Sequence, residues 1–166
     1  LLPLCAARCT VRNCDWRTEL ALFEAAVSAY PHSTKSLFNL GVQQQQQQRQ
    51  QQALHTYRQV LQVYPPHFKA WLNRGSVLQD LHLCEAAQQH FRGAAQRSTS
   101  HRQAAMAYNN LGAALRHSDS QETLHCYYKA ITLDPSYGEA YFNLAALTQP
   151  PKQRRRLLAV ALLCEP

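Results

Sequence analysis

One arrangement of apolar residues recurs along the chain: an aromatic residue or Leu, Ala or Val three positions later, and Pro eight positions after the first. It occurs as Phe23-Ala26-Pro31, Tyr57-Val60-Pro65, Tyr127-Ala130-Pro135 and Leu158-Ala161-Pro166, and as Phe91-Ala94 with Thr99 in place of Pro. The closing positions 31, 65, 99, 135 and 166 are 34, 34, 36 and 31 residues apart. A repeat of this length indicates a stacked array of similar units.

A second apolar pattern lies between the closing positions, and it consists of an aromatic residue or Leu, two further residues, Leu, and then Gly. Its four copies begin at Leu37, Trp71, Tyr108 and Tyr141; the second has Arg74 in place of Leu, and the last has Ala145 in place of Gly. Together the two patterns resemble the tetratricopeptide repeat (TPR), a helical hairpin of 34 residues. The small residue is expected to let the second helix pack closely, and Pro is expected to end it.

These signals predict an all-α fold, a right-handed superhelix of about four and a half TPR hairpins. The predicted helix pairs are 34–47 with 51–63, 68–80 with 84–96, 104–116 with 120–133, and 138–148 with 152–164, after a single helix at 15–30. The array therefore spans residues 15–166, with repeats near 15–33, 34–67, 68–101, 104–137 and 138–166. Residues 1–14 form an apolar lead-in, either the end of a membrane helix or the first helix of a partial repeat.

Composition supports a helical, well-packed chain. Apolar residues make up 46% and charged residues 16%, and there are only five Gly. Residue 1 is Leu and the only Met is Met106, so we expect a fragment, a processed product or an incomplete gene model. The opening apolar run is too short for a complete membrane span, which needs about 20 residues.

A glutamine tract runs from Gln43 to Gln52 and is broken only by Arg49. The spacing from Pro31 to Pro65 is still 34, so the tract replaces residues of the repeat and inserts none. It removes the Gly that the pattern places at the turn between the two helices. It is interpreted either as a tract tolerated at a surface turn, which we favour, or as a functional polyglutamine.

Candidate chemistry is sparse. The six Cys form no C-x2-C pair, and His82 near Cys84 and His125 beside Cys126 have no third metal ligand in view. No phosphate-binding loop, serine-hydrolase or zinc-protease motif occurs. We therefore expect no catalytic residue, no metal and no cofactor in this chain.

The net charge of +7 has one dense source, Lys152 with Arg154, Arg155 and Arg156. Such a cluster can bind nucleic acid, but no aromatic residue interleaves it, and a solvated helix face is the favoured interpretation.

One polar residue type repeats in register. Asn39, Asn73, Asn110 and Asn143 each directly precede the Leu-Gly position of a first helix. First helices of TPR hairpins line the concave surface, and a carboxamide can pair with both the N–H and the C=O of an extended peptide. This arrangement resembles the asparagine ladder of the O-GlcNAc transferase TPR superhelix, although Asn is also frequent at this position for packing. Further candidate groove contacts are Phe38, Leu72, Asn109, Phe142, Lys35 and Lys69.

A more specific resemblance lies at residues 8–23, which read Arg8-Cys-Thr10-Val-Arg12-Asn13-Cys-Asp15-Trp16-Arg17-Thr-Glu19-Leu-Ala-Leu22-Phe23. This segment resembles the transmembrane and TPR-containing O-mannosyltransferases, in which a similar stretch follows the last membrane helix. The resemblance implies an endoplasmic reticulum membrane protein with lumenal repeats, dolichol phosphate mannose as the donor, and cadherin-type acceptor proteins. It implies no catalytic residue within this chain.

The sequence therefore predicts a protein-binding or peptide-binding module that positions an acceptor protein for such a transferase. The alternative is a stand-alone TPR adaptor in the cytoplasm with no enzymatic parent. A partner held in the groove is expected in both cases, nucleic acid is not, and a membrane would be reached only through a region before residue 1.

Overall fold

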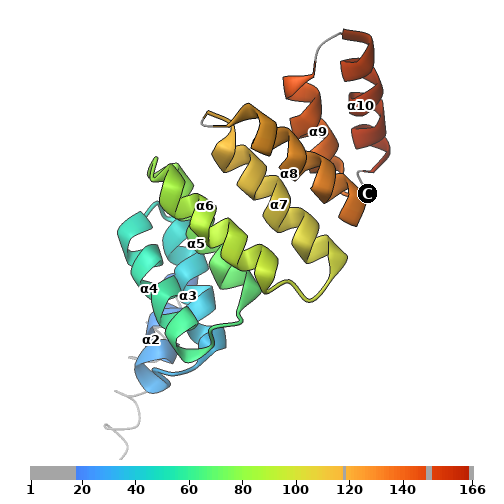
Figure 1. The fold of residues 1–166 in the computed structure, drawn as a ribbon. Coiled ribbons are helices and arrows are strands. Elements are labelled where there is room, and N and C mark those ends of the chain that lie inside the picture. The colour runs from blue at the N-terminus through green and yellow to red at the C-terminus, as the bar shows by residue number, and fades with distance from the viewer. Residues whose placement is uncertain (1–17, 118, 149–150, 165–166) are drawn as a thin grey trace, which may run out of the picture. The chain divides into compact units, whose positions relative to one another are not determined.

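The structure is a computed structural model, and it describes residues 18–117, 119–148 and 151–164. These residues form nine helices and no strand. The helices are α2 (Glu19–Ala29), α3 (Thr34–Gln46), α4 (Gln50–Val63), α5 (Phe68–Asp80), α6 (Cys84–Gln96), α7 (His101–Leu115), α8 (Ser120–Leu133), α9 (Gly138–Leu147) and α10 (Pro151–Leu163). After α2, they pair into four hairpins (Figure 1). The predicted all-helical repeat fold is therefore confirmed.

Side chains just before several helices fix where those helices begin. The hydroxyl of Ser33 accepts a hydrogen bond from the backbone N–H of Ser36 at the start of α3. Ser100 accepts in the same way from Gln103, so α7 begins at His101, three residues earlier than predicted. Such caps satisfy N–H groups that have no partner inside the helix.

The chain divides into two compact units, residues 1–65 and 66–166. In the first, α3 packs against both α2 and α4. The buried residues of the α3–α4 hairpin are Leu37, Leu40, Ala53, Tyr57 and Val60. Because these residues recur three and four positions apart, each helix turns one continuous apolar face toward the other.

The second unit contains the hairpins α5–α6, α7–α8 and α9–α10. The first helix of each later hairpin contacts both helices of the hairpin before it, so α7 packs against α5 and α6, and α9 packs against α7 and α8. An ion pair of 2.8 Å between Arg92 and Glu122 joins the first two hairpins. Stacking of this kind buries apolar faces that a single hairpin leaves exposed.

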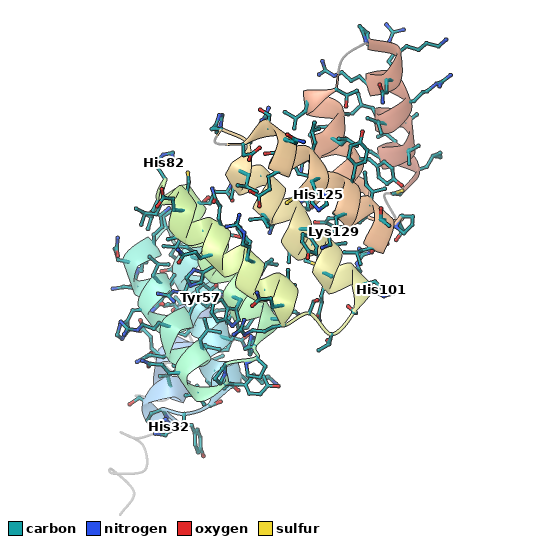
Figure 2. The ribbon with its side chains drawn as sticks, in the orientation of Figure 1. His32, Tyr57, His82, His101, His125 and Lys129 are labelled. Carbon is teal, nitrogen blue, oxygen red and sulfur yellow. The ribbon has the colours of Figure 1, made fainter. Side chains whose placement is uncertain are left out.

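Three glycines lie directly beneath aromatic rings of the second helix in the same hairpin. A Cβ atom would lie 2.7 to 2.8 Å from the nearest ring atom in each pair, Gly41 with Tyr57, Gly75 with Phe91, and Gly112 with Tyr127. Tyr57 is labelled in Figure 2 between α3 and α4. The prediction that a small residue permits close helix packing is therefore confirmed, and the ring that requires the space is identified.

In the last hairpin, small residues occupy both the position that glycine holds in the other hairpins and the position that the aromatic ring holds. Ala145 replaces the glycine in α9. The residue sixteen positions later is Ala161, and the same spacing separates Gly41 from Tyr57. Both alanines are buried. The helices approach closely at Gly138, whose Cβ would lie 2.9 Å from the carbonyl oxygen of Ala161.

This pairing corrects the sequence alignment of the last repeat. Ala105 and Ala130 lie in one buried cluster of the α7–α8 hairpin. In the α9–α10 hairpin the corresponding positions are Gly138 and Cys164. A Cβ atom added at Gly138 would lie 3.3 Å from the Cβ atom of Cys164. Ala161 and Cys164 therefore occupy the places that the sequence pattern assigned to Leu158 and Ala161. The three-residue offset explains the short spacing of 31, because Pro166 is not the true repeat mark.

The glutamine tract folds into the same turn as the next repeat. Gln48 lies between α3 and α4 with φ 60°, and His82, 34 residues later, lies between α5 and α6 with φ 59°. The hydrogen bond from Arg49 N to Gln44 O, 2.8 Å, matches that from Leu83 N to Leu78 O, 2.9 Å. His82 stands at the tip of its turn in Figure 2. The turn therefore keeps its geometry without the glycine that would adopt positive φ at least cost.

The tract also contributes to the hairpin interior. Gln44 is buried, and its Oε1 accepts a hydrogen bond of 2.7 Å from the Thr56 hydroxyl. Gln45 accepts one of 3.0 Å from the Tyr57 hydroxyl. These bonds join α3 to α4, so at least two glutamines of the tract have structural partners.

Candidate functional site

A groove of about 780 Å³ lies in the unit formed by residues 66–166. Its walls come from the end of α5, the middle of α7, the start of α9 and the second half of α10. The described lining residues are Ser76, Gln79, Asp80, Asn109, Asn110, Ala113, Gly138, Glu139, Phe142, Asn143, Leu158, Ala161 and Leu162. Carboxamides, two carboxylates and an apolar surface therefore border the same space.

Three asparagines connect neighbouring first helices across the groove. Nδ2 of Asn143 donates to Oδ1 of Asn109 over 2.9 Å, and Nδ2 of Asn109 lies 3.4 Å from Oδ1 of Asn110. Asn109 is only 3% exposed, whereas Asn110 and Asn143 are partly exposed. The buried amide of Asn109 thus holds the two outer amides in position.

The outer amides keep hydrogen-bonding capacity toward the groove. Nδ2 of Asn110 donates to none of the residues that the structure describes, and Oδ1 of Asn143 accepts from none of them. A carboxamide offers two donors and an acceptor with two lone pairs. The site therefore presents an open donor on α7 and an open acceptor on α9.

Glu139 lines the groove at the start of α9, and the buried Tyr137 lies beside it. The Tyr137 hydroxyl donates to Oε2 of Glu139. Burial, reinforced by this hydrogen bond and by the Glu139 charge, raises the pKa of Tyr137 above its ordinary value, so the hydroxyl stays protonated. The bond orients the Glu139 carboxylate, which remains exposed.

The end of the groove next to α10 is apolar. Phe142 is 62% exposed and Leu162 is 70% exposed, so both present apolar surface to the groove. The position of Phe142 within its helix corresponds to Leu72 in α5 and Asn109 in α7, and both of these are buried. In the α9–α10 hairpin, the residue at this position borders the groove.

The structure brings together four of the ten predicted contact residues, Asn109, Asn110, Phe142 and Asn143. The others of the same unit do not line this groove. Leu72 is only 8% exposed and packs in the core, Asn73 is partly buried and takes part in an interaction within the fold, and Lys69 is exposed.

The three predicted contacts of the first unit are separate from this groove. Asn39 borders a smaller pocket of about 260 Å³ between α2 and α3. Phe38 packs beside Tyr57 with ring centroids 6.0 Å apart, and Lys35 is exposed. Phe38 therefore packs partly within its own hairpin.

The sequence interpretation missed both carboxylates of the groove. Asp80 follows Asn73 by seven residues, and Glu139 precedes Asn143 by four. Residues three, four and seven apart share one face of a helix. Counting along the face of each ladder asparagine would therefore have found them, whereas the contribution of Leu158 and Leu162 from α10 depends on tertiary packing.

The cysteines and possible metal ligands of the described residues form no recognisable reactive centre, and the thiol of Cys126 is buried. These contain no group of three or more His, Cys, Asp or Glu side chains placed to hold a metal ion. Cys84, Cys126 and Cys164 are free thiols, while Cys5, Cys9 and Cys14 lie outside the described range. Burial, and secondarily the Glu122 charge, raises the pKa of Cys126 to about 11, which disfavours its nucleophilic thiolate form.

Two further features concern charge and membranes. Lys152 and Arg154 to Arg156 are exposed on the first half of α10. Of the helices within the described ranges, none combines the length and the apolar character that crossing a membrane requires.

No protein-family model and no curated protein matches the chain. Its fold is similar to solved structures of MamA, one 17% identical with a TM-score of 0.73, covering 87% of this chain and 85% of that one. MamA 41-end from Desulfovibrio magneticus RS-1 is 20% identical with a TM-score of 0.68, covering 87% and 78%. PilF of Pseudomonas aeruginosa is 19% identical with a TM-score of 0.75, covering 87% and 66%.

These likenesses establish the class of fold. The described residues adopt an all-helical repeat fold of the TPR type.

Proposed function

We propose that the chain is a protein-binding TPR module and that the groove between α5, α7, α9 and α10 holds an extended polypeptide segment. The observation that carries this proposal is the asparagine network, in which Asn109 fixes Asn110 and Asn143 while their outer atoms stay open. A volume of about 780 Å³ has room for several residues of peptide.

The two outer asparagines suit a peptide backbone. Nδ2 of Asn110 donates to a peptide C=O, and Oδ1 of Asn143 accepts from a peptide N–H. Since both groups occur in every residue of a peptide, this contact gives affinity without reading side chains. Side chains of the bound segment are then read by the remaining walls of the groove.

The test is a selection of random decapeptides displayed on phage against the full chain, followed by affinity measurement on a recovered peptide. The variant Asn110→Ala removes one outer amide without disturbing the bond between Asn143 and Asn109. We expect it to weaken binding by roughly five- to tenfold, the effect of about one net hydrogen bond. Helicity by circular dichroism should not change.

Gln121→Ala is the matched control, because Gln121 is an exposed carboxamide on α8 outside the groove. It should bind the recovered peptide like the parent chain. If Asn110→Ala binds equally well, the asparagines serve packing and the backbone-pairing role is wrong. If the selection recovers no peptide at all, the proposed function itself fails.

A finer proposal concerns the parent protein. The resemblance of residues 8–23 supports a lumenal module of an endoplasmic reticulum O-mannosyltransferase that positions a cadherin-type acceptor. Residues 8–17 lie outside the described range, Thr18 caps α2, and Glu19 to Phe23 form its first turns. The alternative, a stand-alone adaptor, rests on the repeat fold alone.

Sequencing the transcript upstream of Leu1 separates the two. The transferase proposal expects several apolar stretches of about 20 residues running into Leu1. A nearby start codon without such stretches would leave the adaptor.

A further inference from the structure

We propose that the groove selects segments that carry Lys or Arg close to a large apolar side chain. This inference rests on the proposed peptide-binding function and specifies the class of partner. Two sets of lining residues carry it, the carboxylates of Asp80 and Glu139 and the apolar surface of Phe142, Leu158 and Leu162.

The charge of the groove is opposite to that of the chain. The chain has 17 Lys and Arg against 10 Asp and Glu, a net charge of +7. The described lining residues include Asp80 and Glu139 but no Lys, Arg or His. Because the described charged residues that line the groove are all negative, the groove favours a positively charged ligand although the protein as a whole is basic.

Both carboxylates are available to a ligand. The ion pairs found among the described residues are Arg92 with Glu122 and Arg102 with Asp134, so neither uses Asp80 or Glu139. Both side chains are exposed. Of the two Glu139 carboxylate oxygens, the Tyr137 hydroxyl contacts Oε2, which leaves Oε1 for a cation.

Asp80 and Glu139 lie on the two helices that neighbour the helix carrying Asn110. Asp80 is the last residue of α5, and Glu139 is near the start of α9, while α7 with Asn110 contacts both helices. A backbone held by Asn110 therefore has a carboxylate on the neighbouring helix on each side. Long Lys or Arg side chains can reach such positions while their methylene groups cover apolar surface.

The apolar wall specifies the second requirement. Phe142 and Leu162 are both more than half exposed and border the same space. Burying a side chain the size of Leu or Phe against them stabilises a complex by the hydrophobic effect. An acidic segment would bring like charges toward Asp80 and Glu139, so the groove discriminates against it.

The experiment uses the full chain and the double variant Asp80→Asn/Glu139→Gln, each panned with the same random decapeptide phage library. On the parent chain we expect enriched sequences that contain Lys or Arg within a few residues of Leu, Ile, Phe, Trp or Met. On the double variant the basic preference should disappear while the apolar preference persists.

A synthetic copy of the most enriched peptide, with blocked ends, then gives the magnitude. Replacing its basic residues with Gln should weaken binding by about two- to fivefold per residue, the range of an exposed ion pair. Replacing them with Glu should weaken it further. Affinity of the basic peptide should fall as salt is raised, because exposed charges are screened.

Glu85→Gln is the matched control, because Glu85 is an exposed carboxylate on α6 outside the groove. It should keep the basic preference. Enriched sequences that lack basic residues, or a preference that survives in the double variant, would overturn the inference while leaving peptide binding intact. Absence of any enriched peptide would instead remove the proposed function and this inference together.

Discussion

Gly75 and Phe91 are in such close contact that no side chain fits between them: a Cβ atom at Gly75 would lie 2.7 Å from Cε1 of the Phe91 ring. Phe91 is fully buried, so the ring cannot move into solvent. The same relationship recurs in the hairpins on either side of this one along the chain. It sets the distance between the two helices of a hairpin.

We predict that Gly75→Ala destabilises the chain by about 1–3 kcal/mol, the usual cost of overpacking a core. In an exposed helix the same change stabilises by about 0.5–1 kcal/mol, so the sign alone is informative. Urea unfolding followed by circular dichroism measures it. Gly75→Ala combined with Phe91→Leu should recover part of the loss because the ring is removed.

Ala146→Gly provides the calibration for that experiment, since Ala146 is exposed in α9. It should cost about 1 kcal/mol through helix propensity alone. A stabilising effect of Gly75→Ala would show that the ring has room to shift and would contradict the packing argument.

Gln48 has φ 60°, a conformation that glycine adopts with less strain than any other residue. We predict that Gln48→Gly stabilises the hairpin by about 1 kcal/mol, since the left-handed conformation costs other residues roughly 1–2 kcal/mol. His82→Gly should behave alike. The midpoint of urea unfolding is the measurement.

Gln47→Gly is the matched control because Gln47, the adjacent residue, has φ −85°. It should give no gain. Equal effects at positions 47 and 48 would mean that the stabilisation comes from shortening the glutamine run rather than from the backbone conformation.

Thr56 and Gln44 form a buried hydrogen bond of 2.7 Å between α4 and α3. We predict that Thr56→Val destabilises by about 1–3 kcal/mol, because it leaves the Gln44 oxygen buried without this donor. The double variant Thr56→Val/Gln44→Leu should be more stable than Thr56→Val alone. If both variants lose the same stability, the cost belongs to packing at Thr56.

His67 begins α5 as its cap, with Nδ1 accepting a hydrogen bond of 3.1 Å from the N–H of Ala70. Burial, with a smaller effect from Lys69, lowers the pKa of His67 from its ordinary value of 6.5. The unfolded chain therefore takes up a proton more readily than the folded one. The stability from this cap is complete above pH 6.5 and is lost as the pH falls through the folded-state pKa.

The variant His67→Asn keeps an acceptor that does not titrate. We expect the variant and the parent chain to have the same free energy of unfolding at pH 7.5. At pH 5 the variant's free energy of unfolding should be larger by about 1 kcal/mol, the usual contribution of a helix cap. His90, whose pKa burial also lowers, supplies a remaining pH dependence in both proteins. A variant that loses stability with falling pH as steeply as the parent would exclude His67 as the source.

The helices of this fold were predictable because local signals mark their ends. The ranges 68–80, 84–96 and 120–133 agree with α5, α6 and α8. The start of α7 was placed three residues late because Thr99 replaces Pro and Ser100 provides the cap. The alignment of the last repeat was also wrong, because Ala145 and Ala161 replace the glycine and aromatic ring that marked the other hairpins.

The candidate site was predictable only in part. Register along the chain identified Asn110 and Asn143, but their link through the buried Asn109 depends on how α9 stacks on α7. Leu72 shows the limit of counting, because it shares the repeat position of Phe142 and is nevertheless buried. Exposure at one repeat position therefore varies with the neighbouring hairpin, which periodicity along one chain does not reveal.

The glutamine tract has a consequence for inheritance. Runs of identical codons gain and lose units readily when DNA is copied, and because Gln43 to Gln48 are identical residues, an added glutamine gives the same sequence wherever it enters this run. Gln44 before the turn and Ala53 after it are both buried, and a residue added inside a helix would rotate everything beyond it by about 100°. The chain can instead place the extra residue in the turn from Gln47 to Arg49, so small changes in the length of the tract should leave both buried residues in place.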